Sequence, residues 1–537
     1  MLLIYIIGFS LLFVIIYYLT SNTKSLSINT IVTEWKNPKL NTYFDFDNLS
    51  NYFYYKSKNA QEKKVSDEVV NDLDLDDVFM FLDRTSSKIG QQYLYYRLRS
   101  INNDNLSALI DLFVKNEKIR LETQLELKKL DSPNGYDFEK LLNNQFIKPK
   151  FEKYYLILLI ILILAFLLSF IAKYFILLII PVFFINSILH YKNKKYTTFF
   201  FNGLKQMITA YKVSKQILKI KEINNNYQKN DFIQPIKKLT KRTRFIIVGE
   251  ALNNPSAIVF WLLFEVVKIL FNLEGIVFYS LFNDINKHKK NLEDLFVFIG
   301  KIDTAISVSS IIIHNQTCKP KFVDDKKLEV KSVYHPLVPN CVRNDITLHH
   351  KSLLLTGSNM SGKTTFIRTI AINNILAQTL NFCFADEFIS LKFNVLSSIR
   401  ITDDLFNSKS YYLQEVLRIK ELIAASNLNK PYLFILDEIF RGTNTTERIA
   451  ASKAVLSYLN RNNHMVLVST HDIELVELLS DDNYELFHFS EKIEGNQLSF
   501  DYQIKKGHLR LKNAIKILEL YDYPSVIISE ANRIADK

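Results

Sequence analysis

One loop sequence constrains this fold more than any other feature, because it works only between a strand and a helix. The apolar run Leu353–Thr356 is typical of a buried strand, and Thr365 to about Leu380 has the pattern of a helix. Between them stands Gly357-Ser-Asn-Met-Ser-Gly-Lys-Thr364, which matches the P-loop pattern G-x-x-x-x-G-K-[ST]. From about Lys319 onwards, short aliphatic runs alternate with helical patterns, which predicts a parallel α/β domain around this loop.

The loop also predicts a phosphate site. Its glycines let the backbone curl so that N–H groups and the positive end of the following helix dipole face an anion. Lys363 can reach the β- and γ-phosphates, and the Thr364 hydroxyl can ligate Mg²⁺. We therefore expect ATP and Mg²⁺ as ligands, with ATP contacted by Gly357, Ser358, Asn359, Met360, Ser361, Gly362, Lys363, Thr364 and Thr365.

Two further apolar runs end in polar residues suited to the same site. Tyr432–Leu436 leads into Asp437 and Glu438, and Met465–Ser469 leads to His471. Asp437 is expected to hold Mg²⁺ through water, and Glu438 to orient or deprotonate the attacking water. In ATPases of the ABC class, a histidine placed like His471 senses the γ-phosphate. Without the loop upstream, the two acids would be an ordinary solvated strand end and His471 a structural histidine.

The first 23 residues predict a membrane anchor. They contain no charge, and Leu2–Leu19 is almost wholly apolar, enough for roughly 27 Å of helix. A cleaved signal peptide is the alternative. It is disfavoured because a basic n-region is missing and Tyr17, Tyr18 and Leu19 stand where small residues would be needed.

A second apolar region predicts a transmembrane hairpin over residues 154–191. Tyr154–Ala172 and Tyr174–Tyr191 carry no charge and are separated by Lys173, and lysines flank the region on both sides. The positive-inside rule then places both flanks in the cytosol, which predicts the cell (inner) membrane with the ATPase domain on its cytoplasmic side. A buried core hairpin is the alternative. The stretch Ala257–Phe282 contains charges at near-helical spacing and is interpreted as a core helix pair, with an interfacial segment as its alternative.

Length and composition fit a soluble body with a few membrane spans. At 537 residues two or more domains are expected. A hydrophobic content of 48% and a mean hydropathy of +0.02 are high for a fully soluble protein and low for a polytopic transporter. The predicted order is an anchor at 1–23, a helical region at 24–153, the hairpin at 154–191, a second helical region at 192–318 and the α/β domain at 319–537.

Net charge and cysteine content limit the possible binding partners, the cellular compartment and the metal content of the protein only in part. The net charge of +12 suits nucleic acid or anionic lipid, but lysines are spread over the whole chain, so charge alone leaves a DNA-binding surface open. Cys318, Cys341 and Cys383 form no CxxC pair. They indicate a reducing compartment and no structural metal.

Taken together, the motifs resemble those of the MutS family of mismatch-repair ATPases. Gly357–Thr365 is similar to that family's Gly-Pro-Asn-Met-Gly-Gly-Lys-Ser-Thr, Asp437–Thr446 to its Asp-Glu-Ile-Gly-Arg-Gly-Thr-Ser-Thr, and Tyr334–Val338 to its Arg-His-Pro-Val-Val. The segment Ile401–Ser410, followed by Glu415, resembles the one that touches the partner subunit's nucleotide, with Ser410 matching the serine used there, and Asn513–Pro524 resembles a helical dimer contact. The resemblance implies an ABC-like ATPase domain, a homodimer with a composite site, and duplex or branched DNA as a partner.

The resemblance extends upstream, with departures. Phe81–Thr85 with Gly90 looks like the start of the MutS core and Ile302-Asp303 like its close, which puts the hairpin where the family's helical levers project towards DNA. The first 60 residues contain no mismatch-reading domain, so recognition of mispaired bases in the usual way is not expected. Cys341 stands where many relatives carry an aromatic residue that stacks on adenine. Ser408 and Tyr411 replace the Gly and Thr that flank the family's serine.

Three functions are consistent with these patterns. The first is a membrane-anchored, MutS-like ATPase that couples ATP hydrolysis to DNA binding. The second is a nucleotide-gated membrane scaffold that binds protein partners and no DNA. The third is a transporter-like ATPase, which three spans per chain and the absence of a Leu-Ser-Gly-Gly-Gln motif disfavour.

Overall fold

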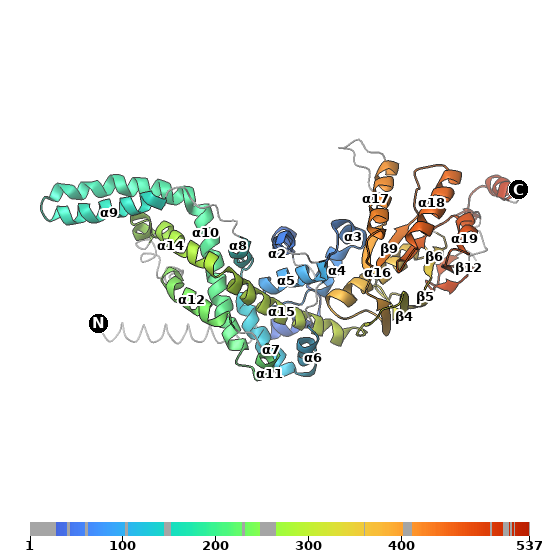
Figure 1. The fold of residues 1–537 in the computed structure, drawn as a ribbon, viewed down its shortest axis with the longest axis horizontal. Coiled ribbons are helices and arrows are strands. Elements are labelled where there is room, and N and C mark those ends of the chain that lie inside the picture. Colours follow the sequence, from blue (N-terminus) through green and yellow to red (C-terminus); the bar gives the residue numbers. More distant parts are fainter. Residues whose placement is uncertain are drawn as a thin grey trace. The chain divides into compact units, whose positions relative to one another are not determined.

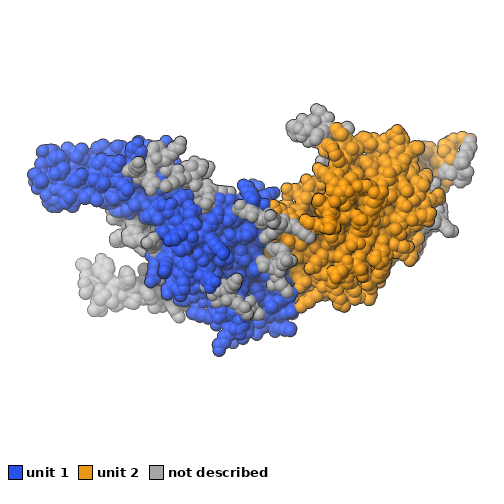
Figure 2. Space-filling model, in the orientation of Figure 1, with its two compact units in different colours: residues 1–61, 83–96, 106–311 blue, residues 62–82, 97–105, 312–537 orange. Residues whose placement is uncertain are grey.

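The computed structural model describes residues 28–39, 43–59, 63–101, 106–143, 152–227, 231–247, 265–358, 360–400, 411–494, 497–507, 515, 518–519 and 521–535. The chain divides into two compact units (Figure 2). Unit 1 contains residues 1–61, 83–96 and 106–311, and unit 2 contains residues 62–82, 97–105 and 312–537. The predicted anchor, residues 1–23, lies outside the described residues. A helical region is followed by an α/β domain, as the sequence predicted.

Unit 1 is built almost wholly from helices (Figure 1). Its long helix α15 forms the core, because nearly every residue between Leu292 and Ile311 is buried. The helices of this unit are α2 (Phe46–Asn59), α5 (Lys88–Arg99), α6 (Ser107–Lys115), α7 (Glu117–Leu127), α8 (Asp137–Asn143), α9 (Glu152–Ser169), α10 (Ile179–Ile217), α11 (Lys221–Asn226), α12 (Ile233–Ile247), α14 (Leu273–Lys287) and α15 (Lys289–His314).

A buried carboxylate joins the two ends of this helical unit. Asp303, on α15, is fully buried and accepts hydrogen bonds from the backbone N–H groups of Ser86 and Ser87, both at 2.8 Å. The Ser87 hydroxyl donates to the same carboxylate at 2.6 Å. Since buried carboxylates are tolerated only when hydrogen-bonded, these contacts fix the start of α5 against α15.

Gly90 is required by this packing. A Cβ atom at Gly90 would lie 2.1 Å from Oδ2 of Asp303, whose carboxylate is held by the hydrogen bonds to Ser86 and Ser87 and has no room to move. We therefore expect Gly90→Ala to destabilise unit 1 by about 1–3 kcal/mol through overpacking. Thermal unfolding measures this as a lowered midpoint. The exposed control Lys118→Ala on α7 should leave the midpoint within error, and a Gly90→Ala midpoint equal to wild type would contradict the packing argument.

The predicted hairpin is present as α9, a short 3-10 turn (Lys173–Leu178) and α10. A small apolar seam holds the two helices together, formed by Leu158 and Leu162 on α9 and Val182 on α10. The outer faces are apolar as well: Phe170 and Ile171, at the tip, are 78% and 82% exposed. Such a continuous exposed apolar surface is unusual for a protein surrounded by water.

The count of three membrane spans is not supported. Among the described residues two helices are long and apolar enough to cross a membrane, Lys173–Lys194 and Lys289–His314, while Tyr154–Ser169 is shorter. The helix Lys289–His314 has 78% of its apolar window buried, so it serves as the core of unit 1. The first hairpin helix is shorter than predicted because Ala172 adopts an extended backbone conformation before the turn.

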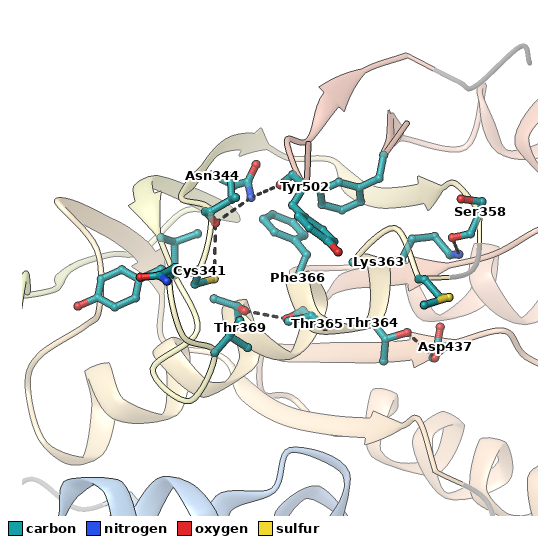
Figure 3. Close-up of a pocket in the computed structure, with 18 of the residues that line it drawn as sticks. Cys341, Asn344, Ser358, Lys363, Thr364, Thr365, Phe366, Thr369, Asp437 and Tyr502 are labelled. Atoms are coloured by element: carbon teal, nitrogen blue, oxygen red, sulfur yellow. Dashed lines mark hydrogen bonds between the residues drawn. The ribbon is translucent and has the colours of Figure 1, made fainter. Parts of the chain in front are cut away.

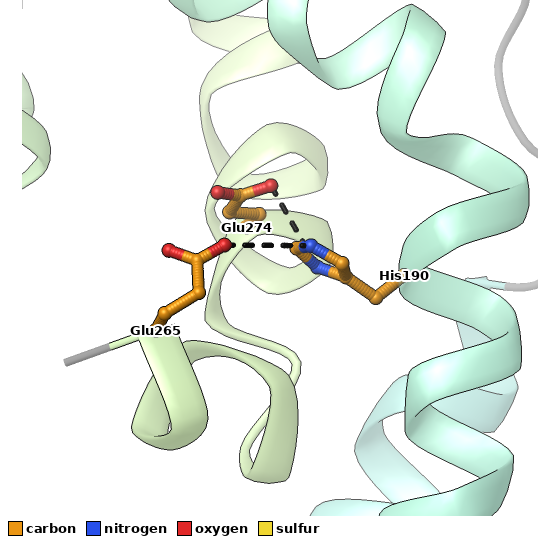
Figure 4. A group of neighbouring side chains, drawn as sticks. All are labelled: His190, Glu265 and Glu274. Carbon is orange, nitrogen blue, oxygen red and sulfur yellow. Dashed lines mark ion pairs between the residues drawn. The ribbon is translucent and has the colours of Figure 1, made fainter. Parts of the chain in front are cut away.

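A buried ion network lies at the base of the hairpin (Figure 4). His190 on α10 lies between Glu265 and Glu274, with its Nε2 3.8 Å from the first carboxylate and its Nδ1 3.8 Å from the second. Lys268 donates to Glu274 at 3.2 Å and also contacts Glu265. Because the ammonium group contacts both carboxylates and the two ring nitrogens face different partners, this network ties α10 to the helix at 265–270 and to α14.

Unit 2 contains the two main sheets. The larger has the order β14-β11-β6-β10-β9-β8, in which all neighbours are parallel except β14 and β11; the smaller has the order β3-β7-β4-β5. The strands of these sheets are β3 (Lys321–Val323), β4 (Lys327–Val333), β5 (Asn344–His349), β6 (Ser352–Thr356), β7 (Glu387–Leu391), β8 (Asn394–Ser398), β9 (Tyr432–Asp437), β10 (Met465–Ser469), β11 (Tyr484–His488) and β14 (Lys505–Lys506). Two further pairs are β1 (Lys63–Lys64) with β2 (Ser100–Ile101), and β12 (Glu491–Glu494) with β13 (Gln497–Phe500).

The central strands of the larger sheet are buried on both faces. Every residue of β6 and β10 is buried, as is all of β9 except Asp437 at its end. This is the pattern of parallel strands covered by helices. The helices of unit 2 are α3 (Asp67–Asp72), α4 (Leu75–Leu82), α16 (Lys363–Thr379), α17 (Tyr411–Ser426), α18 (Thr445–Leu459), α19 (Ile473–Leu479) and α21 (Ser525–Ala535).

An N-terminal segment is part of unit 2. Residues 62–82, which the sequence assigned to the helical region 24–153, pack with the α/β domain. Asp72 accepts hydrogen bonds from the Ser397 hydroxyl at 2.7 Å and the Arg400 N–H at 2.9 Å. Asp74 pairs with Arg400 at 2.5 Å and with Arg368 at 3.1 Å. Asp72, at the end of α3, and Asp74, two positions further on, therefore hold both the end of β8 and the helix α16.

Candidate functional site

The site is built on the loop between β6 and α16. Gly357 and Gly362 adopt φ values of +146° and +102°, which strain any residue with a side chain. A Cβ at Gly357 would also lie 2.8 Å from the carbonyl oxygen of Phe489. Gly362 is the N-cap of α16, so the free N–H groups and positive dipole of this helix face the loop. The arrangement is suited to an anion.

Lys363 lies inside the curl of this loop. Its ammonium group donates to the carbonyl oxygens of Gly357 at 2.8 Å and Ser358 at 2.9 Å, and its Nζ is 3.1 Å from Nε2 of His471. Burial lowers the pKa of Lys363, whereas the charges of Glu438 and Asp437 act in the opposite direction. The lysine is therefore a buried cation. When phosphate is bound, its oxygens would take the place of the two backbone carbonyl oxygens as acceptors for the ammonium group.

Glu438 is held from three sides. Its Oε1 lies 2.9 Å from His471 Nε2, its Oε2 lies 2.8 Å from Arg441 Nε, and its backbone N–H donates to Ser469 at 2.9 Å. Burial acts to raise the pKa of Glu438, but the hydrogen bond from His471 and the charges of His471, Arg441 and Lys363 outweigh it, and the pKa is lowered. The carboxylate is thus ionised at neutral pH. The Nε2 atom of His471 thus lies between the Glu438 carboxylate and the Lys363 ammonium group.

Asp437 and Thr364 form an oxygen pair beside the loop. The Thr364 hydroxyl donates to Oδ2 of Asp437 at 2.9 Å, and the Ser469 hydroxyl donates to Oδ1. A hydroxyl and a carboxylate are the oxygen ligands that Mg²⁺ prefers. The donor set therefore fits Mg²⁺ in its predicted place.

A cavity of about 650 Å³ extends from these residues. Figure 3 shows Lys363, Thr364 and Asp437 at one end of it and Cys341 and Asn344 at the other, with Phe366 and Tyr502 between them. The volume lies within the range of small-molecule sites, roughly 300–1,000 Å³. One polar end and one partly apolar end suit a ligand that carries phosphates on a ring system.

The predicted site residues come together wherever they are described. Ser358, Met360, Gly362, Lys363, Thr364, Thr365, Asp437 and Glu438 line the cavity, Gly357 and Ser361 shape the loop beneath it, and His471 contacts Lys363 and Glu438. Asn359 and Ser410 lie outside the described residues. Cys341 lines the far end, as the resemblance implied.

Sequence reasoning missed two groups of the site. Arg441 contacts Glu438 from three residues further along the chain, a spacing that could have indicated the pair. Tyr502 lies 3.3 Å from the position that a Cβ on Gly362 would take, and its carbonyl accepts from Asn344 at 3.0 Å. No motif surrounds Tyr502, so the sequence held no signal for it.

Comparison with known proteins agrees with this geometry. The family model described as MutS domain V matches residues 353–537, which contain the loop, Asp437, Glu438 and His471 but not Cys341 and Asn344 at the far end of the cavity. This part of the chain is therefore similar to MutS domain V. It contains the larger sheet, apart from Ser352 at the start of β6, and the edge at which the site lies.

Curated relatives are similar to this chain over about half of its length. A DNA mismatch repair protein MutS from Listeria monocytogenes serotype 4b is 32% identical over 274 residues, 48% of this chain and 32% of that protein. Proteins of the same name from Fusobacterium nucleatum and Thermotoga maritima are 29% and 31% identical, over 49% of this chain and 31% and 34% of their own lengths. The chain spans about a third of the length of the curated relatives it matches.

Proposed function

We propose that this protein is an ATPase whose P-loop, Gly357–Thr364, binds the phosphates of ATP and whose Glu438 activates the attacking water. The observation that carries the proposal is the meeting of Lys363, Asp437 and Glu438 at the carboxyl edge of β6 and β9. Phosphoryl transfer needs positioning and charge stabilisation more than covalent chemistry. A buried lysine, an ionised carboxylate and a histidine around one cavity supply both.

The roles of the residues follow from their contacts. Lys363 and the N-terminus of α16 neutralise the phosphates, and Thr364 with Asp437 would hold Mg²⁺, which supplies charge to the phosphate oxygens when bound. Glu438 accepts a proton from water or orients it, and His471 donates to Glu438 next to Lys363. ATP is the substrate class that fits these residues.

Two substitutions separate binding from turnover. Lys363→Ala should lower affinity for ATP by at least about a hundredfold, because it leaves the phosphates without their buried cation. Glu438→Gln should leave affinity within about twofold and lower turnover by about a hundredfold or more. A fluorescent ATP analogue measures the first quantity and phosphate release the second.

Glu421→Gln serves as the control for a lost surface carboxylate, since Glu421 is exposed on α17 and pairs with Arg418. It should behave as wild type in both assays. Unchanged hydrolysis in both Lys363→Ala and Glu438→Gln would refute the assignment of the site.

The proposal includes a homodimer with composite sites. It rests on the resemblance of the segment that ends at Ser410 to the part of MutS that touches the partner's nucleotide, and on the apolar residues Val526 and Ile534 of α21, which are exposed. An amphipathic C-terminal helix with an uncovered apolar face suits a contact with a second copy.

We also propose that the hairpin of α9 and α10 inserts into the cell (inner) membrane, with the ATPase domain on the cytoplasmic side. Its support is the exposed apolar surface of both helices and the absence of charge between Tyr154 and Ala172. Removing such a surface from water is favourable by about 25 cal/mol for each Å² buried. Lysines at 192 and 194 suit the headgroup region.

Charge placed on the hairpin tests its insertion. Leu164 and Leu167 are both about half exposed on α9, and a lysine at the bilayer centre costs about 3 kcal/mol. In protein that lacks residues 1–23, whose predicted anchor would itself bind vesicles, the double variant Leu164→Lys, Leu167→Lys should therefore lose co-flotation with phosphatidylcholine–phosphatidylglycerol vesicles. Ser280→Lys, at an exposed position on α14, is the matched control and should float as wild type. Equal flotation of all three proteins would count against insertion.

DNA is proposed as the macromolecular partner of the helical unit. The support is the name of the curated relatives, which are DNA mismatch repair proteins, together with the net charge of +12. We expect detergent-solubilised protein to bind duplex or branched oligonucleotides with an affinity that falls steeply as salt rises, as counterion release requires. Fluorescence anisotropy with duplex, branched and mismatched DNA, with and without ATP, measures this. No binding at low salt, or a flat salt response, would favour the scaffold that binds protein partners.

A further inference from the structure

The turn that carries Glu438 has an unusual backbone. Glu438 and Phe440 adopt φ values of +50° and +62°, so two residues with side chains lie in the left-handed region within three positions. Each such residue costs roughly 1 kcal/mol or more and persists only where its surroundings hold it. Something outside the turn must therefore stabilise this conformation.

The group that holds the turn is Glu415, on the first turns of α17. Its side chain is 1% exposed, and its Oε1 accepts a hydrogen bond from the backbone N–H of Phe440. Burial raises the pKa of Glu415, while the N–H groups of Phe440, Arg441 and Gly442 favour its charged form. A buried carboxylate that accepts a hydrogen bond from the backbone N–H of Phe440 ties α17 to this turn, and here the anion belongs to the protein itself.

Packing reinforces this link between α17 and the turn. A Cβ on Gly442 would lie 2.8 Å from Cβ of Tyr412, so the turn has no space to shift towards the helix. The rings of Tyr412 and Phe440 are also in contact, with centroids 6.3 Å apart. The start of α17 and the turn are therefore packed directly against each other.

We propose that Glu415 is a positioning residue for ATP hydrolysis: it holds the 438–442 turn in the conformation that presents the Glu438 carboxylate to His471 and to the attacking water. The inference rests on the proposed function, because it assumes that Glu438 acts in turnover. It deepens that function by making turnover, and not ATP binding, depend on the first turns of α17. The P-loop residues Lys363 and Thr364 make no contact with Glu415 among the interactions of the described residues.

Two variants test the proposal in the full-length protein. Glu415→Gln keeps the shape but removes the charge and turns an amide donor towards backbone donors. Glu415→Ala removes the acceptor altogether. We expect kcat to fall about tenfold in the first and about a hundredfold in the second, as displacement of a reacting group by about 1 Å does. Affinity for a fluorescent ATP analogue should stay within about twofold, because the phosphate loop is untouched. Glu421→Gln, on the exposed face of the same helix, should match wild type.

A double variant separates positioning from a merely structural role. If Glu415 acts through Glu438, then adding Glu415→Gln to Glu438→Gln should cause no further fall in the residual single-turnover rate, because effects on one working unit are not additive. A further tenfold fall in the single-turnover rate of the double variant would overturn the proposal. So would a Glu415→Gln variant in which ATP affinity falls as much as kcat and the thermal midpoint falls as well. So would wild-type kcat in Glu415→Ala. If wild type itself fails to hydrolyse ATP, or Glu438→Gln hydrolyses as wild type does, the proposed function fails instead.

Discussion

The site depends on the parallel pairing of β10 with β6 on one side and with β9 on the other. The ladder sets Ser469 opposite Leu355 and also opposite Asp437, so the three strands end at one level. The chain then leaves each strand at the same edge, which brings together the P-loop, Glu438 and His471. Ligands bind at this edge in open α/β sheets for the same geometric reason. Without this register, Lys363 and Glu438 would belong to separate parts of the surface.

The sequence predicted this edge well because its chemistry is local. The residues of the proposed phosphate site follow closely after three buried strands, and buried parallel strands appear in a sequence as uninterrupted apolar runs. Lys363, Asp437 and His471 were each found from the few residues around them. Their meeting in space followed from the rule that parallel strands share an edge. The helical character of the N-terminal region was predictable in the same way, from apolar spacing.

What the sequence did not reveal depends on contacts between distant segments. Tyr502 reaches the cavity through a hydrogen bond with Asn344, and Glu415 reaches the 438–442 turn from another helix. Neither contact could be predicted from the spacing of neighbouring residues in the sequence. Length and hydropathy alone also do not distinguish α15 from the hairpin helix Lys173–Lys194, because the two are similarly apolar. They differ in burial: 78% of the apolar window is buried in α15 and 17% in the hairpin helix.

The Asp72 contact has a consequence for how the chain folds. Asp72 and the Ser397 hydroxyl that it binds are 325 positions apart. At a synthesis rate of about 5–20 residues per second, α3 and α4 leave the ribosome roughly 15–65 s before β8 does. During that time Val69, Val70 and Phe79, all buried in the finished protein, have no partner strand. The short N-terminal part of unit 2 must therefore stay exposed, or be held by a chaperone, until residues 312–537 have been made.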